Sequence, residues 1–256
     1  MRTWVFTGSI FLAAVLYAVQ GTAANRGIAD MEELFRRGND HYEKGEYSAA
    51  AGEYEKIIAQ GYESGPVYYD LAGAYFKSGK LGKAILNYER SRLLMPRDAD
   101  MNSNYRFARS MVRAKAVPRR GIWNWLPLRI CSKNLTVDEL TLLCSGMYML
   151  IIVLAFAGLV YPALKRFCSA ITAVLFVLIL LGSLVTWNEI STMKQSAVTV
   201  VPKTDAFFGP FDSATKFFVL QEGMNVTALK SKDEWLKIRR VDDKVGWVKK
   251  GDVEKI

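Results

Sequence analysis

The chain has 256 residues, 51% of them apolar, and its 34 lysine and arginine residues outnumber its 25 acidic residues to give a net charge of +9. This length allows one or two domains, and the apolar share is high for a purely soluble protein. With a single histidine and no HExxH, GxxxxGK[ST] or GxGxxG motif, the sequence argues against histidine-based catalysis and nucleotide binding, so we expect no enzyme, no catalytic residue, no metal and no cofactor.

Residues 1–24 have the plan of a secretory signal peptide. Arg2 precedes an apolar run over residues 4–19, and Ala23 and Ala24 provide a small-residue cleavage site. The alternative is an anchor helix that is not cleaved, because the apolar run is long for a signal peptide. Under either interpretation, the residues that follow are exported.

Residues 31–64 can be laid over residues 65–98 at a spacing of 34. This alignment pairs Gly38 with Ala72, Gly45 with Gly79, Ala50 with Ala84 and Tyr54 with Tyr88. Small residues suit the close approach of two antiparallel helices, and glycine suits a left-handed turn between them. Each unit is therefore predicted to be a helix–turn–helix pair, and residues 99–113 are predicted to add a capping helix.

The spacing and residue choice over residues 31–98 resemble tetratricopeptide repeats. The resemblance implies an all-α solenoid whose first helices line a groove that binds a protein partner. By repeat position, the groove would be lined by Phe35, Asn39, Tyr42, Glu43, Tyr69, Gly73, Phe76 and Lys77, with Phe107 extending it. The alternative is that these aromatic residues only pack the solenoid. Some such repeats bind a C-terminal carboxylate, but here Phe35 and Asp70 stand where basic or amide groups would be expected, which puts that ligand in doubt.

The linker over residues 114–137 is basic and rich in tryptophan. Indole rings lie at a membrane interface and cations meet anionic lipid there, so we expect this linker to lie beside a membrane. The residues concerned are Arg119, Arg120, Trp123, Trp125 and Arg129. The alternative is a linker whose tryptophans pack on a neighbouring domain. A nucleic-acid partner is not expected on the exported side.

Residues 138–190 contain two apolar runs, at about 140–161 and 168–187, each long enough to cross a bilayer. The short link between them predicts a helical hairpin that leaves both soluble parts on one side. Lys165 and Arg166 in this link favour a cytoplasmic location for it. Combined with the leader, this predicts two spans in a bacterial inner membrane, with the soluble parts in the periplasm.

Residues 195–256 contain short β-branched runs separated by turns. The predicted strands are Ala197–Val201, Phe217–Leu220, Asn225–Leu229, Trp235–Val241 and Val245–Lys249. Short, closely spaced strands of this kind indicate a small all-β barrel. A turn at Glu222-Gly223, a core tryptophan at Trp235 and a late strand at Gly246-Trp247-Val248 resemble the bacterial SH3-like domain.

The resemblance departs in the loop over residues 203–214, where AFFGPF replaces a polar stretch. Phe207, Phe208 and Phe211 form either an exposed ligand-binding loop or a cover for the barrel base. With Trp235 and Trp247, these phenylalanines are the candidate contacts of the barrel for peptidoglycan or another cell-wall ligand.

The expected fold is thus a multidomain membrane protein: a tetratricopeptide solenoid, a two-helix transmembrane hairpin and an SH3-like barrel. This order of parts resembles the BatE family of Bacteroides aerotolerance (Bat) type operons. The resemblance implies an inner-membrane assembly with von Willebrand A-type Bat proteins and a MoxR-type ATPase system, in aerotolerance or stress response. We expect a non-catalytic adaptor that binds proteins through its groove. The alternative is an envelope receptor whose barrel binds the cell wall.

Overall fold

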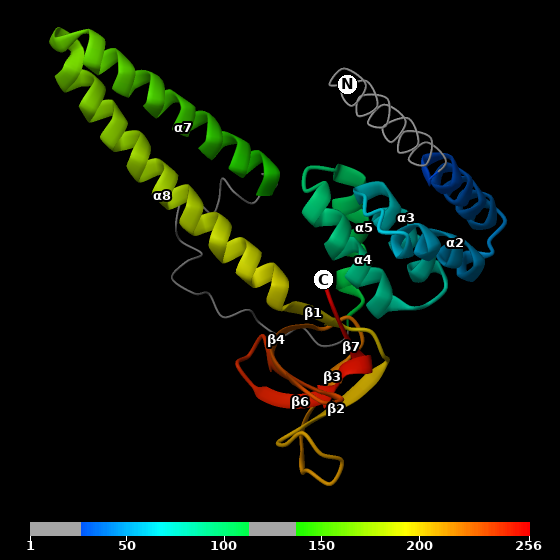
Figure 1. Cartoon of the computed structure of the whole chain (residues 1–256). Coiled ribbons are helices and arrows are strands. Elements are labelled where there is room, and N and C mark those ends of the chain that lie inside the picture. The colour runs from blue at the N-terminus through cyan, green and yellow to red at the C-terminus, as the bar shows by residue number, and fades with distance from the viewer. Residues whose placement is uncertain (1–26, 113–136) are drawn as a thin grey trace, which may run out of the picture.

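The computed structural model describes residues 27–112 and 137–256. The leader over residues 1–24 and most of the basic linker therefore lie outside the described residues, and so do its membrane-interface candidates Arg119, Arg120, Trp123, Trp125 and Arg129. Figure 1 shows three described parts: a helical domain (residues 27–112), a long two-helix hairpin (137–195) and a C-terminal β domain (196–256).

The helical domain consists of two helix–turn–helix pairs and a further helix (Figure 1). A helix over residues 27–43 and α2 (Tyr47–Ala59) form the first pair. The second pair comprises α3 (Gly65–Lys77) and α4 (Leu81–Leu94), and α5 (Ala99–Ser110) follows. Side chains cap two of these helices, because Ser64 Oγ accepts the N–H of Val67 and Asp98 Oδ1 accepts the N–H of Met101.

The two turns inside the pairs have the same geometry. Gly45 and Gly79 have φ of +77° and +79°, in the left-handed region that favours glycine. The N–H of Glu46 donates to the carbonyl of His41, and the N–H of Lys80, 34 residues on, donates to the carbonyl of Tyr75, both at 2.9 Å. Both turns lie where the 34-residue alignment placed them.

The packing inside the pairs also repeats. The rings of Phe35 and Tyr54 have centroids 5.8 Å apart, and those of Tyr69 and Tyr88, one repeat later, are 6.1 Å apart. Gly38 must be small, because a Cβ there would lie 2.5 Å from the Tyr54 ring. Tyr54 is 1% exposed, so its ring cannot move aside without disturbing the core.

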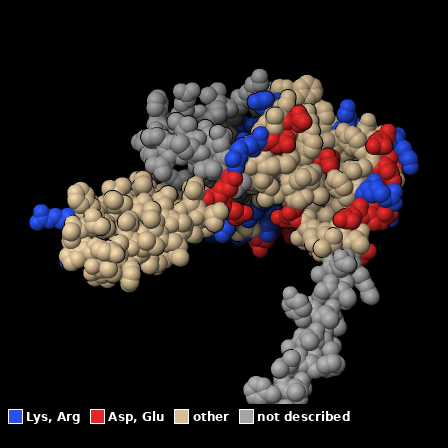
Figure 2. Space-filling view, turned by 90° about the horizontal axis from the view of Figure 1, so that it is seen from above, with Lys and Arg blue, Asp and Glu red and all other residues tan. Residues whose placement is uncertain are grey.

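The hairpin consists of α7 (Val137–Val160), the 3-10 turn η2 (Pro162–Leu164) and α8 (Lys165–Gln195). In the view of Figure 2 its surface is uncharged between its two ends and basic at its far end, unlike the mixed charges of the other described parts. The helices approach closely at small residues: a Cβ at Gly182 would lie 3.0 Å from Cys144 Sγ. Asp138–Val160 and Pro162–Leu184 are long and apolar enough to cross a membrane.

The structure corrects the predicted ends of the second apolar helix. Lys165 and Arg166 lie in its first turn rather than in a loop, and the helix continues to Gln195 instead of ending near residue 187. The physical reason is that residues 188–195 contain neither glycine nor proline, so nothing breaks the helix before β1 begins at Ser196.

The β domain is an antiparallel sheet in the order β3-β2-β6-β5-β4-β1-β7. Its strands are β1 (Ser196–Thr199), β2 (Lys203–Phe207), β3 (Lys216–Gln221), β4 (Asn225–Lys232), β5 (Trp235–Arg240), β6 (Val245–Lys249) and β7 (Val253–Lys255). Side chains alternate between buried and exposed along the strands, and Leu220, Ile238 and Val248 are fully buried.

Two strands were not predicted. β2 lies in the segment assigned to a loop, and β7 is only three residues long. Neither segment carries enough β-branched residues to be recognised from its own sequence. Both are held by partners far along the chain: Asp205 in β2 pairs with Val219, and Val253 in β7 pairs with Thr199.

The helical and β domains share one hydrophobic core. Gly223, in the left-handed region at φ +76°, lies so close to α4 that a Cβ there would be 2.5 Å from Ile85 Cδ1. The carboxylate of Glu222 accepts the N–H of Gly82 at 2.8 Å. Because Lys80 provides no side-chain cap for α4, the β domain caps this helix.

Polar contacts complete this interface. Asn225 of β4 donates to Glu89 of α4 at 2.9 Å, and Arg109 of α5 donates to Asn225 Oδ1 at 3.0 Å. Arg90 pairs with Glu254 at 3.1 Å. The second helical pair, which repeats the internal packing of the first, is therefore fixed to the β domain.

Candidate functional site

A cavity of about 460 Å³ opens on the helical domain, between the helix over residues 27–43, α3 and α5. We call it the groove. Its lining residues are Asn39, Tyr42, Glu43, Tyr54, Tyr69, Asp70, Gly73, Phe76, Lys77, Tyr88, Asn104 and Phe107. A hollow of this volume suits a small ligand or a single long side chain with its adjoining backbone.

The structure brings most of the predicted groove residues together. The exception is Phe35, whose ring packs on Tyr54 in the core. The lining also includes Tyr54, Asp70, Tyr88 and Asn104. Of these, the sequence singled out Asp70, as the residue that stands where a carboxylate-binding repeat has a basic or amide group, and it lies one turn before Gly73 and two turns before Lys77 on α3. No comparable sequence signal points to Asn104 of α5.

Aromatic rings form the walls of the groove. On one side the rings of Phe76 and Phe107 meet edge to face, with centroids 5.8 Å apart. Tyr54 and Tyr88 are almost fully buried and form part of the floor. Asn39 and Asn104 fix two of the tyrosines: Tyr54 Oη donates to Asn39 Oδ1 at 2.7 Å, and Asn104 Nδ2 donates to Tyr69 Oη at 2.6 Å.

Asp70 is the charged group of the groove interior. Burial raises the pKa of its carboxyl to about 6. No hydrogen bond or ion pair joins it to another residue in the two described ranges. Burial also raises the pKa values of Tyr42, Tyr54 and Tyr88, and the nearby Asp70 charge adds to each increase. The carboxylate therefore lies among tyrosines without a positive partner.

Two further charged residues line the groove. Glu43 and Lys77 are both exposed, so water screens them more than it screens Asp70. Among the described residues, Lys77 forms no ion pair with Asp70. The groove therefore has an unneutralised negative charge inside and opposite charges among its exposed lining residues.

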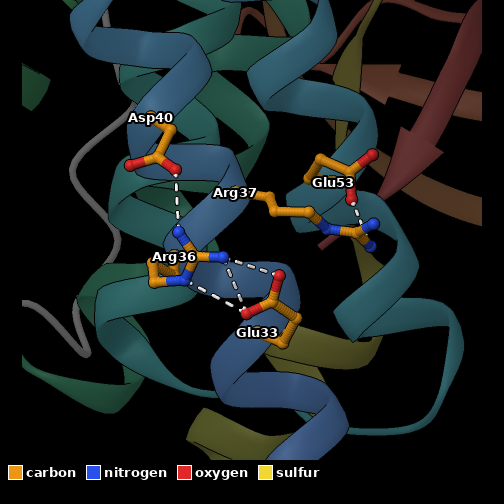
Figure 3. A network of polar contacts seen from close by, with 5 residues as sticks. All are labelled: Glu33, Arg36, Arg37, Asp40 and Glu53. Carbon is orange, nitrogen blue, oxygen red and sulfur yellow. Dashed lines mark hydrogen bonds and ion pairs between the residues drawn. The ribbon is translucent and has the colours of Figure 1, made fainter.

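The outer face of the first pair has a different kind of charge cluster (Figure 3). Arg36 binds Glu33 at 2.7 Å and Asp40 at 3.1 Å, while Arg37 reaches Glu53 of α2 at 3.0 Å. The arginine side chains are 62% and 46% exposed, so these pairs stabilise the fold only weakly. Their charges are already paired, and we assign them no binding role.

The remaining chemistry-bearing residues are scattered. His41 lies beside Glu46, with Nδ1 2.5 Å from Oε2, on the surface of the first pair. Within residues 27–112 and 137–256, no three histidine, cysteine, aspartate or glutamate side chains form a group that could hold a metal ion.

The aromatic candidates of the β domain divide into two kinds. Trp235 is 7% exposed and meets the half-buried Phe207 edge to face, with ring centroids 5.5 Å apart. Trp247 is half-buried beneath Lys237. Phe208 and Phe211 are 62% and 55% exposed. The loop thus has one phenylalanine that packs on the domain and two that face solvent.

No known protein family and no curated protein matches the chain.

Proposed function

We propose that the chain is a non-catalytic, membrane-anchored adaptor whose groove binds a segment of a partner protein. The observation that carries the proposal is the groove itself, which gathers side chains from all of the helices of the two pairs and from α5. A surface assembled from separate helices and hollowed between them suits an extended chain better than a flat partner. The hairpin would hold this adaptor at a bilayer.

The finer family assignments belong to the same proposal. The repeated turns at Gly45 and Gly79 and the repeated ring pairs support tetratricopeptide repeats. The short, strongly bent antiparallel sheet supports an SH3-like domain. A BatE-like role would make the partners von Willebrand A-type membrane proteins and a MoxR-type ATPase system, in an assembly for aerotolerance or stress response.

We place both described soluble parts in the periplasm and the hairpin tip in the cytoplasm. Two features support this topology. An ion pair between Arg97 and Glu139 joins the helical domain to the first turn of α7, and α8 leads directly into β1, so both domains lie at one end of the hairpin. Lys165 and Arg166 lie at the other end.

A reporter active only in the periplasm tests this topology. Fused after Ile256, it is expected to be active; inserted beside Lys165, it is expected to be inactive. Activity at the second position and none at the first would reverse the orientation and overturn the placement.

Site-specific photo-crosslinking tests the adaptor function. Phe107 in the groove and Phe211 on the β domain are 56% and 55% exposed, so a photoreactive phenylalanine at either position has similar access to partners. Protein adducts from position 107 are expected in cells that express the full chain. If position 107 gives no protein adduct under conditions in which position 211 does, the groove is not the binding surface.

The exposed phenylalanines favour a second candidate function, an envelope receptor whose β domain binds peptidoglycan. Phe208 stacks against Phe217 with ring centroids 4.3 Å apart, and Phe217 is itself 40% exposed, giving an apolar surface next to the exposed Phe211. The full chain in detergent would sediment with purified sacculi under this hypothesis. Loss of sedimentation on Phe208→Ser with Phe211→Ser would support it over the adaptor.

A further inference from the structure

The chemistry of the groove indicates which type of residue the proposed adaptor binds in its partner segment. Asp70 is half-buried in the groove and has no partner among the described residues, and burial raises the pKa of its carboxyl. A buried carboxylate is costly unless a positive group or hydrogen-bond donors compensate it. A groove that keeps an uncompensated carboxylate is suited to a ligand that supplies a positive charge.

The walls of the groove suit the same ligand. Cations are attracted to the faces of tyrosine and phenylalanine rings, more strongly where water is excluded. Tyr69, whose hydroxyl accepts a hydrogen bond from Asn104, is half-buried and offers ring surface, whereas Tyr54 is almost fully buried and closes the floor. The Tyr42 hydroxyl, by contrast, has no partner within the described part of the chain, and it faces the small Gly73, whose Cβ would lie 3.5 Å from it.

We propose that the groove takes a cationic side chain, an arginine or lysine from an extended segment of a partner protein, with its charged group against the Asp70 carboxylate. This inference rests on the proposed adaptor function and specifies the chemistry of the partner. The aromatic rings surround the alkyl part and the face of the cation, while the Tyr42 hydroxyl and the exposed Glu43 are available for further hydrogen bonds.

The opposite ligand chemistry fits poorly. A C-terminal carboxylate or an acidic side chain would bring a second negative charge next to Asp70, and like charges in a desolvated site repel strongly. Among the described residues, Lys77 is the only basic one that lines the groove, and it is exposed. A single screened ammonium does not outweigh a carboxylate inside the groove.

The volume limits how much of the partner enters. About 460 Å³ is near the lower end of the range for small-molecule pockets. One long side chain and its adjoining backbone fit this space, and Asp70 offers a single carboxylate to pair with a cation. We therefore expect the bound segment to require a basic residue at one position and to tolerate many residue types at the neighbouring positions.

Selection from a random dodecapeptide library displayed on phage tests the proposal with the full chain in detergent. Peptides enriched on the wild-type chain are expected to share one arginine or lysine. Selection on Asp70→Asn, which keeps the shape and removes the charge, should lose this preference. In fluorescence anisotropy, replacing the shared basic residue by alanine and replacing Asp70 by asparagine should each weaken binding at least about tenfold, a loss typical of a charge pair removed from a desolvated site.

Lys77→Ala is the matched control, because it removes a charge of opposite sign from the same helix and the same groove. It is expected to make cationic peptides bind about twofold more tightly, since it removes a screened repulsion. A general loss of structure would weaken binding in both variants, so opposite responses identify an electrostatic cause.

The outcomes separate this inference from the proposed function. If the enriched peptides lack a basic residue, or if Asp70→Asn keeps the basic preference, the cation inference is overturned and the peptide-binding groove remains. If the wild-type chain enriches no peptide beyond a chain carrying Gly73→Leu, which fills the groove, then both the groove function and the inference are overturned.

Discussion

The two helical pairs follow one pattern but have different surroundings. α2 buries only the face that packs within the domain, through Ala50, Ala51, Tyr54 and Ile57. α4 occupies the same place in the second pair, yet it buries nearly all of its length from Gly82 to Ser91, because the β domain covers its other side. The internal pattern of a repeat therefore fixes how a pair packs, whereas its outer surface is specialised by segments far along the chain.

Glu55 and Glu89, which are 34 residues apart, give the sharpest test of this difference. Both accept a tyrosine hydroxyl, from Tyr75 and Tyr105 respectively. The Glu55 side chain is 52% exposed, whereas that of Glu89 is 5% exposed and also binds Arg92 and Asn225. Glu89→Ala should therefore lower the free energy of unfolding by about 3–5 kcal/mol, since it leaves buried polar partners unpaired.

Glu55→Ala should cost no more than about 1 kcal/mol, as expected for an exposed ion pair. Urea unfolding of the detergent-solubilised chain, followed by circular dichroism, measures both substitutions. Equal losses would mean that the β domain does not distinguish the two pairs.

Gly82→Ala tests the closeness of the second pair to the β domain. The added Cβ would lie 2.5 Å from the carbonyl oxygen of Thr199 and 2.9 Å from Val200 Cα, and backbone atoms cannot move aside as a flexible side chain can. We expect a cost of about 1–3 kcal/mol from overpacking and faster hydrogen exchange in β1. Ser48, one repeat earlier, is exposed and already carries a side chain. Unchanged exchange after Gly82→Ala would argue that this interface is looser than the structure has it.

The comparison also explains what the sequence could predict. The helix pairs and their turns were predictable because they depend on local spacing and on glycines at Gly45 and Gly79. The docking of α4 was not, since Glu222 and Asn225 lie more than a hundred residues beyond the helix that they contact. β2 and β7 were missed for the same reason, because their pairing partners supply what their own residues lack.

Most of the groove could be predicted from repeat position, but the desolvation of its carboxylate could not. Asp70 follows the same face of α3 as Gly73 and Lys77, so its position was readable from the sequence. Its surroundings come from other helices, because its charge acts on Tyr42, Tyr54 and Tyr88. A carboxylate on an exposed helix would be unremarkable; desolvation within the groove makes it a candidate binding group.

Asp70→Asn tests a difference between the first helices of the two pairs. Arg36 occupies in the first pair the position that Asp70 occupies in the second. Burial raises the pKa of Asp70 from 3.8 to about 6. The folded chain therefore holds this proton more tightly than the unfolded chain, and stability falls as pH rises from about 4 to 6. Above pH 6, Asp70→Asn should stabilise the fold by roughly 1–2 kcal/mol, after discounting for solvent screening.

Urea unfolding at pH 4 and pH 8 measures this effect, which should vanish at the lower pH. The neighbouring tyrosines stay neutral across the interval because burial raises their pKa values. Arg36→Gln is the control and should leave the pH profile unchanged, because Arg36 lies in an exposed cluster outside the groove. Destabilisation by Asp70→Asn at pH 8 would reveal a positive partner for Asp70 outside the described residues.

Gly52→Ala has the smallest expected effect and tests the open face of the first pair. Leu86, one repeat later, is 1% exposed, whereas nothing lies within 4 Å of a Cβ placed at Gly52. Because alanine favours a helix interior over glycine, the substitution should stabilise the chain by about 0.5–1 kcal/mol, raising the midpoint of thermal unfolding. A lower midpoint would mean that another surface packs on this side of α2, and the first pair would then be covered as the second pair is.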